Sequence, residues 1–221
     1  MAFLRALTVF DSVAWMNHPR ETYQAETKPF QLAVAQRVGF TVPSTLVSND
    51  ASAIQELFPS DVMIKPLDTV LIREGDETLF AYANAARADS LDNRATPQSP
   101  LIAQDLKTGK VDWRVTVIGD EIYPVRILKD SRGIEGDWRR TPKADLRYED
   151  GDLPPAVASS CKHLLREVGL SFGGIDLIET ADGFSFVEVN PTGEFGWLVE
   201  PHRPLDQVIA RWLACGGAFG E

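Results

Sequence analysis

The segment 173–191, which reads GGIDLIETADGFSFVEVNP, constrains the fold more strongly than any other part of the chain. Its apolar halves flank Ala181-Asp182-Gly183, a combination typical of a three-residue hairpin loop whose glycine takes a positive φ. This register places Asp176 opposite Glu188, and the alternation of side chains puts Asp176, Glu188 and Asn190 on one face of the sheet. Like charges in directly opposed positions destabilise a sheet, so this pair calls for a positive partner.

A hard cation is the partner that two carboxylates and an amide oxygen favour. Mg²⁺ typically takes one or two carboxylates and completes its shell with water and phosphate oxygens. The alternative is a solvated, charged strip, which is disfavoured because the same register places Ile178 opposite Phe186 on that face. A slip of one residue would move Asp176 to the other face of the sheet.

Composition narrows the class of protein. The 221 residues are 44% hydrophobic and 24% charged, which excludes a disordered chain. No apolar run approaches the roughly 20 residues of a membrane span. Arg5 and Asp11 interrupt the only apolar stretch of the N-terminus, which disfavours a secretory signal. Cys161 and Cys215 do not form a CxxC pair, so we expect a cytoplasmic protein without structural zinc.

The distribution of charge is uneven. The whole chain has 32 acidic and 22 basic residues, a net charge of −10, which argues against a surface for nucleic acid or an anionic membrane. Residues 107–147, in contrast, hold 10 Lys/Arg and 7 Asp/Glu, a local charge of +3. This basic stretch is either a chance fluctuation or an anion site.

Secondary-structure signals predict an α+β protein with antiparallel, hairpin-built sheets. Few strand–helix–strand units are present, which disfavours a doubly wound dinucleotide fold. A loop is expected at 83–100, where small and polar residues predominate. Helices are expected at 26–39, 50–58, 156–168 and 204–214, single strands at 42–47, 61–66, 69–73, 78–82 and 101–104, and hairpins at 112–129 and 173–190.

The chain resembles a known family in the order of several motifs. Asp176 in one strand, Glu-Val-Asn ending the next strand and then Pro-x-Gly resemble the metal signature of ATP-grasp enzymes. The longer string GGIDLIETADGFSFVEVNPTGEFGWLVE is similar to the graspetide (microviridin-type) maturases and, more distantly, to ribosomal-protein glutamate ligases. From about residue 15 to 200 other landmarks agree, namely the lysine-bearing helix within 17–50, VMIKPL, LIAQDL, VDWRVTVIGDEI and GDWRR.

The resemblance implies an ATP-grasp fold in which two α+β lobes hold ATP between antiparallel sheets. It further implies an ADP-forming ligase that joins a carboxylate to an amine or hydroxyl through an acyl phosphate, with ATP and a pair of Mg²⁺ ions. The expected substrate is a peptide in natural-product biosynthesis, or an amino acid. Expected boundaries are a lead-in at 1–25, a small lobe at 26–100 and a C-terminal lobe with the Mg-ATP site at 101–221.

The resemblance also assigns roles to individual residues. The magnesium ligands would be Asp176, Glu188 and Asn190. The nucleotide would be bound by Lys28 and Lys65 at the phosphates, by the hinge residues Gln104, Asp105 and Leu106, and by Asp112 at the ribose. The catalytic arginines would be Arg114, Arg139 and Arg126, which shares a face with Arg114 if the first hairpin is regular. From the residues alone, Lys28 could instead be an exposed cation at a helix start, and Lys65 could extend to solvent.

Two features depart from the family. Relatives usually carry a further N-terminal domain of roughly a hundred residues, and whether a homodimer takes its place is left open. The loop after Lys65 is poor in glycine, with Gly75 alone available to bring backbone amides close to phosphates. Two other functions therefore stay open: a ligase for amino acids or other small molecules, and a nucleotide-binding partner subunit without catalysis.

Overall fold

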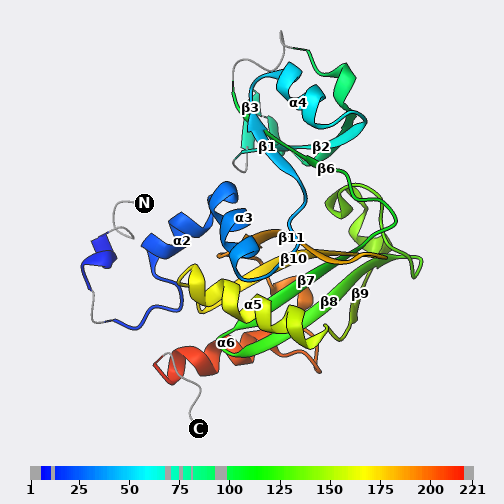
Figure 1. Cartoon of the computed structure of the whole chain (residues 1–221). Coiled ribbons are helices and arrows are strands. Elements are labelled where there is room, and N and C mark those ends of the chain that lie inside the picture. Colours follow the sequence, from blue (N-terminus) through cyan, green and yellow to red (C-terminus); the bar gives the residue numbers. More distant parts are fainter. Residues whose placement is uncertain are drawn as a thin grey trace.

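Two antiparallel sheets organise the protein, a computed structural model that describes residues 6–10, 13–67, 71–74, 77–80, 82–92 and 99–216. A four-stranded sheet forms the small lobe and a five-stranded sheet forms the large lobe, with a separate two-stranded hairpin beside the former (Figure 1). The expected α+β class with antiparallel sheets is confirmed.

The small lobe packs one helix against its sheet. Asp50 caps this helix, since its carboxylate accepts a hydrogen bond of 2.9 Å from the Ser52 backbone N–H. Ile54 and Phe58 on the helix side meet Val62 of the sheet in a compact apolar cluster. The elements are β1 (Thr45–Ser48), α4 (Ala51–Leu57), β2 (Asp61–Pro66), β3 (Leu71–Glu74), β4 (Glu77–Phe80), β5 (Asn84–Arg87), η2 (Ala88–Ser90) and β6 (Leu101–Asp105), with sheet order β1-β6-β2-β5.

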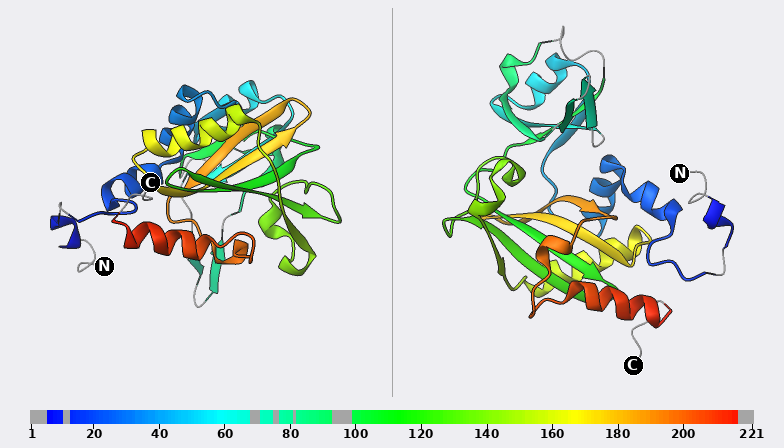
Figure 2. Two further views of the ribbon diagram at one scale, coloured as in Figure 1. Left: turned by 90° about the horizontal axis from the view of Figure 1, so that it is seen from below. Right: turned by 180° about the vertical axis from the view of Figure 1, so that it is seen from behind.

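Helices cover both faces of the large sheet. Two of them, α3 and α5, lie on one face, and α6 lies on the other (Figure 2, left). The sheet order is β11-β10-β7-β8-β9. The strands are β7 (Val111–Ile118), β8 (Glu121–Lys129), β9 (Leu146–Asp150), β10 (Phe172–Thr180) and β11 (Gly183–Asn190). The helices are α2 (Pro19–Ala25), α3 (Lys28–Arg37), α5 (Pro155–Glu167) and α6 (Leu205–Ala214), with short 3₁₀ turns η1 (Leu7–Val9), η3 (Trp138–Arg140), η4 (Lys143–Asp145) and η5 (Gly196–Leu198).

The apolar stripe predicted for 156–168 accounts for the position of α5. Cys161, Leu164 and Leu165 are buried against the sheet, and Gly169, with a φ of +74°, follows the helix end. The four expected helices and both expected hairpins are confirmed to within a few residues.

The expected loop at 83–100 is wrong in part, because β5 and η2 lie within it. The sequence Asn-Ala-Ala-Arg of β5 lacks β-branched and aromatic residues, and its pairing with β2 supplies the strand. Gly75 of the expected phosphate-covering loop lies outside the described residues.

The lobe boundaries also differ from the expected ones. Strand β6 pairs with β1 and β2 and so belongs to the small lobe, although residue 101 was expected to begin the large one. Helix α3 packs against β11 and α5 of the large lobe, although 26–39 was expected in the small one. The lobes are defined by which strands and helices pack together. The chain therefore enters the small lobe just before β1 and returns to the large lobe after β6.

No helix in the described part of the chain combines the length and apolar character that crossing a membrane requires.

Candidate active site

The hairpin β10–β11 brings Asp176 opposite Glu188, as the sequence predicted, although the strand register next to the turn differs from the expected one. Thr180 pairs with Gly183, so the loop has two residues and the pairing next to it is shifted by one. A bulge between Asp176 and Leu177 shifts the register back, with Val187 as the extra residue. The expected position of Phe186 opposite Ile178 is wrong, because the two-residue loop pairs Phe186 with Leu177, and Phe186 is buried on the opposite face.

A row of charges, buried at Asp176 and Arg114, crosses three neighbouring strands. Asp176 on β10 lies beside Glu188 of β11 and, on its other side, beside Arg114 of β7. Arg114 and Asp176 are only 7% and 6% exposed. Arg114 Nε lies 3.1 Å from Asp176 Oδ1, and Arg114 Nη1 donates to the Gly174 carbonyl at 3.3 Å. The positive partner that the carboxylate pair required is therefore supplied from the adjacent strand.

Gly174 provides the space for Arg114. A Cβ atom at residue 174 would lie 2.6 Å from Arg114 Nη1, closer than real Cβ contacts allow. Any side chain at this position would require the guanidinium to move. Glycine thus allows the close approach of Arg114 seen here.

A second arginine bridges the carboxylates from a loop. Arg139 Nη2 donates to Asp176 Oδ2 at 2.8 Å and to Glu188 Oε1 at 2.9 Å. Arg139 lies on η3, where the Asp137 carboxylate caps the turn by accepting from the Arg139 backbone N–H at 3.1 Å. Its side chain is 35% exposed, in contrast to the buried Arg114. One nitrogen atom therefore lies between the two carboxylates.

The two carboxylates differ in their proton affinity. Burial raises the pKa of Asp176 to about 6, although Arg114 and Arg139 oppose this shift. Burial also acts to raise the pKa of Glu188, but Arg139, together with lysines 28 and 65, lowers it overall. Glu188 is thus the more firmly ionised member of the pair.

The opposite wall of the site belongs to the small lobe. Lys65 Nζ donates to Gln104 Oε1 at 2.6 Å, and Gln104 Nε2 donates to Thr45 Oγ1 at 2.9 Å. Burial lowers the pKa of Lys65. Lys28 lies at the first residue of α3 and also faces the site. Lys65 is therefore held by a polar partner inside the cavity, in preference to the extension to solvent considered from sequence.

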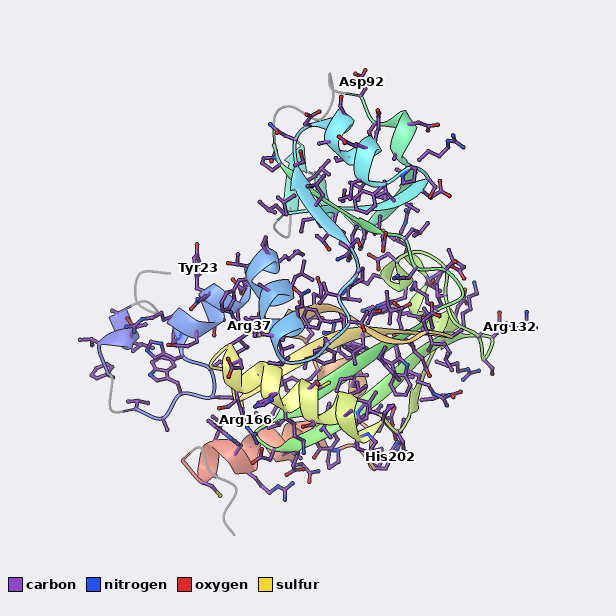
Figure 3. The ribbon with its side chains drawn as sticks, viewed as in Figure 1. Tyr23, Arg37, Asp92, Arg132, Arg166 and His202 are labelled. Atoms are coloured by element: carbon purple, nitrogen blue, oxygen red, sulfur yellow. The ribbon has the colours of Figure 1, made fainter. Side chains whose placement is uncertain are left out.

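These groups line one cavity of about 670 Å³ between the two lobes. Figure 3 shows the small lobe above the large sheet, and the labelled Arg132 and His202 lie at the margins of the large lobe. The structure brings every predicted site residue to this cavity except Arg126 and Leu106. The predicted residues in its lining are Lys28, Lys65, Gln104, Asp105, Asp112, Arg114, Arg139, Asp176, Glu188 and Asn190.

The expected position of Arg126 is wrong. The two-residue turn pairs Ile118 with Glu121, and this register places Arg126 opposite Trp113. Arg126 therefore lies on the face opposite Arg114, where it donates to Glu149 Oε2 at 3.1 Å. In a regular hairpin with a two-residue turn, Arg114 and Arg126 lie on opposite faces of the sheet.

Leu106 lies outside the lining, and the apolar surface comes from other residues. Met63 and Ile178 are among those that supply it. Met63 could have been found from sequence, since it precedes Lys65 by two positions on the same strand and so shares its face. Trp138, Tyr148 and Trp197 also line the cavity, and no sequence pattern linked these scattered aromatic residues.

Gln31 is a further residue that sequence reasoning missed. Its buried amide donates to the Ala25 and Val189 carbonyls at 2.6 and 2.8 Å, and its oxygen accepts from the Val189 backbone N–H at 3.0 Å. Val189 lies between Glu188 and Asn190, so Gln31 ties α3 to the strand that bears both side chains.

Replacing Gln31 with leucine is expected to lower the free energy of unfolding by about 2–3 kcal/mol, because buried backbone groups lose their partners. Urea denaturation followed by circular dichroism measures the change. Gln36→Leu is the matched control, since Gln36 lies on the same helix and is exposed. Equal losses in the two variants would contradict the assigned role of Gln31.

The donor set fits a magnesium ion that is completed by other ligands. Among the described residues, no three His, Cys, Asp or Glu side chains cluster as a metal site. Asp176 and Glu188 nevertheless supply two carboxylates, with Asn190 Nδ2 3.4 Å from Glu188 Oε1. Within the described chain, the buried Asp176 Oδ1 accepts no hydrogen bond despite its ion pair with Arg114. Such an oxygen suits a cation that takes its remaining ligands from phosphate and water.

Solved structures share this architecture. An ATP-grasp ligase from Chryseobacterium gregarium, described as RiPP-associated and bound to ADP with leader and core peptides, is 25% identical with a TM-score of 0.84, covering 97% of this chain and 67% of that one. The macrocyclase MdnC from Microcystis aeruginosa MRC, bound to its precursor peptide MdnA, is 28% identical with a TM-score of 0.81, covering 97% and 69%. The ligase PsnB, complexed with a precursor variant, Mg and ADP, is 29% identical with a TM-score of 0.66, covering 89% and 61%.

The chain belongs to the ATP-grasp superfamily. The ATP-grasp fold expected from the motifs is thereby confirmed. No family model and no curated protein matches the sequence. This ATP-grasp chain spans about two thirds of the length of these solved structures. Its site, as in the expected arrangement, lies between a small and a large antiparallel sheet.

Proposed function

We propose that the chain is an ADP-forming ligase that activates a carboxylate of a peptide and couples it to an amine or hydroxyl. The observation that carries this proposal is the row of charges Glu188–Asp176–Arg114, which faces lysines 28 and 65 across one cavity. Structural similarity to ligases solved with ADP and precursor peptides supports it.

The reaction needs two displacements. A carboxylate oxygen attacks the γ-phosphorus of ATP and ADP leaves; the amine or hydroxyl then attacks the acyl carbon, phosphate leaves and one proton is released. Both steps depend on positioning and on neutralising phosphate charge, with little need for a protein nucleophile. A cavity lined by cations and by a carboxylate pair supplies both requirements.

The residues divide between these tasks. Asp176, Glu188 and Asn190 would hold Mg²⁺, which when bound neutralises phosphate charge. Lys28 and Lys65 are placed to hold the ATP phosphates from the other wall. Gln104, Asp105 and Asp112 are proposed to contact the nucleoside, with Met63 and Ile178 as apolar neighbours.

Arg114 and Arg139 are the proposed contacts for anionic groups of the substrate. A planar guanidinium binds a phosphate or carboxylate through parallel N–H groups. Both side chains line the cavity beside Asp176, whereas Arg126 does not. We assign no role in the reaction to Arg126.

Mass spectrometry tests the function. The purified chain is incubated with ATP, Mg²⁺ and candidate precursor peptides, and released ADP is measured in parallel. Loss of one water per new bond, matched by one ADP, is the expected result, and the sample with AMPPNP in place of ATP should show none.

The other outcomes separate the alternatives. Joining of free amino acids without any change in peptides would replace the peptide ligase with a small-molecule ligase. Binding of Mg-ATP without ADP formation under every acceptor would support a nucleotide-binding subunit that lacks catalysis.

A further inference from the structure

Three aromatic side chains from separate segments form one cluster beside the arginines. Trp138 comes from η3, Tyr148 from β9 and Trp197 from η5. The ring centroid of Trp197 lies 5.7 Å from that of Trp138 and 4.8 Å from that of Tyr148. All three also line the cavity, so the cluster forms part of its wall.

Each tryptophan lies over one of the two arginines. The guanidinium carbon of Arg114 is 5.8 Å from the Trp197 ring centroid, and that of Arg139 is 5.2 Å from the Trp138 ring centroid. Both distances fall within the range of a cation–π interaction, for which tryptophan is the strongest partner. The two tryptophans also contact each other, so the two cation–π pairs belong to one connected cluster.

Polar contacts alone hold Arg114 loosely. Its hydrogen bond to the Gly174 carbonyl is long, at 3.3 Å, and its Nε forms an ion pair with Asp176 without hydrogen-bond geometry. Gly174 lies close to the guanidinium, since a Cβ atom at residue 174 would lie 2.6 Å from Arg114 Nη1. The Trp197 ring is itself fixed, since its Nε1 donates to the Glu194 carbonyl at 3.0 Å.

We propose that Trp197 is a positioning residue that orients the Arg114 guanidinium toward the substrate's anionic group. This inference rests on the proposed ligase function. A planar guanidinium binds an oxyanion well only in a defined orientation. The Trp197 ring contacts the guanidinium and so restricts that orientation, while Asp176 forms an ion pair with Nε. Trp138 supports Arg139 in the same manner.

Two substitutions at Trp197 test this role by kinetics. Trp197→Leu is expected to lower kcat about fivefold with little change in the KM for ATP, because Arg114 loses its support. Trp197→Phe keeps an aromatic face and is expected to retain most of the activity. Trp212→Phe is the control, because Trp212 lies on α6 in the apolar cluster on which Trp197 packs but is not among the residues that line the cavity, so its replacement tests a general loss of packing.

A double-mutant cycle separates positioning from general destabilisation. In an Arg114→Lys background, Trp197→Leu is expected to cost little further activity, since lysine has no planar group to orient. Additive losses in the cycle would overturn the proposal, as would a Trp197→Leu enzyme with unchanged kcat.

Arginine side-chain NMR provides a readout that does not depend on catalysis. With ¹⁵N-labelled arginine, the Nε–H signal of Arg114 is assigned by its absence in Arg114→Lys. This signal is expected to shift in Trp197→Leu and to stay unchanged in Trp212→Phe. An unshifted signal in Trp197→Leu would overturn the positioning role. A wild-type chain without ligase activity would instead overturn the proposed function, and the NMR result would still decide whether Trp197 holds Arg114.

Discussion

Glu188→Gln is expected to reduce ligase turnover about a hundredfold or more, while the fold is retained. Glutamine keeps the shape of the side chain but removes the charge of the more firmly ionised carboxylate in the pair. Without this negative charge the site attracts Mg²⁺ more weakly, and loss of such a charge-stabilising contact typically costs about two to three orders of magnitude. ADP release and peptide mass measure the effect, with thermal denaturation to confirm folding.

Glu149→Gln is the matched control for this variant. Glu149 also lies on a strand of the large sheet and pairs with an arginine, Arg126, but this pair is exposed and lies outside the cavity. Near wild-type turnover is expected for Glu149→Gln. Unchanged turnover in Glu188→Gln would remove the basis for the proposed metal site.

Arg139→Gln is expected to increase the affinity for Mn²⁺, in the absence of nucleotide, by about tenfold. Arg139 Nη2 contacts both carboxylates that would hold the cation, so arginine and metal compete for the same oxygens. Displacing a charge-assisted hydrogen bond costs roughly 1.5–3 kcal/mol, reduced here because Arg139 is about one third exposed. Titration of free Mn²⁺ by electron paramagnetic resonance measures the affinity.

The neighbouring arginine provides the control for the metal titration. Arg140 lies on the same turn, but its Nη1 donates to Asn84 Oδ1 at 2.6 Å on the small lobe. Arg140→Gln should leave Mn²⁺ affinity unchanged. Weaker or equal Mn²⁺ binding in Arg139→Gln would show that Arg139 does not compete with the metal ion.

The pairing of Asp176 with Glu188 shows how far local pattern can reach. Alternation around a turn signal predicted the pair, and the structure contains it. The loop was nevertheless one residue shorter than expected, and the bulge at Val187 compensated. Phe186 shows why the register differs. In the observed register its ring is buried in the core beneath α3 and α5, whereas the expected register would place it on the cavity face. Tertiary packing of one aromatic ring therefore set a detail that the strand sequence left open.

The positions of the arginines, in contrast, could not be predicted reliably from local pattern. Arg114 and Arg126 lie on one hairpin, and an error of one residue in the pairing is enough to exchange the faces. Sequence also left open which arginine would meet Asp176, because that depends on β7 pairing with β10 across a long segment of chain. Arg139 reaches the same carboxylates from a turn without regular periodicity, where no face can be predicted.

Hydrophobic periodicity and turn residues were sufficient for the helices and the two hairpins, because these depend on local spacing. The resemblance of the motifs to those of ATP-grasp enzymes indicated the superfamily and most of the cavity's charged residues. The basic stretch 107–147 likewise proved to contain both arginines of the cavity. Packing between distant segments decided the rest: the assignment of β6 to the small lobe and of α3 to the large lobe, and the contact of Trp197 with Arg114. Such contacts depend on how whole elements pack, and the sequence near each residue carries little information about its distant partner.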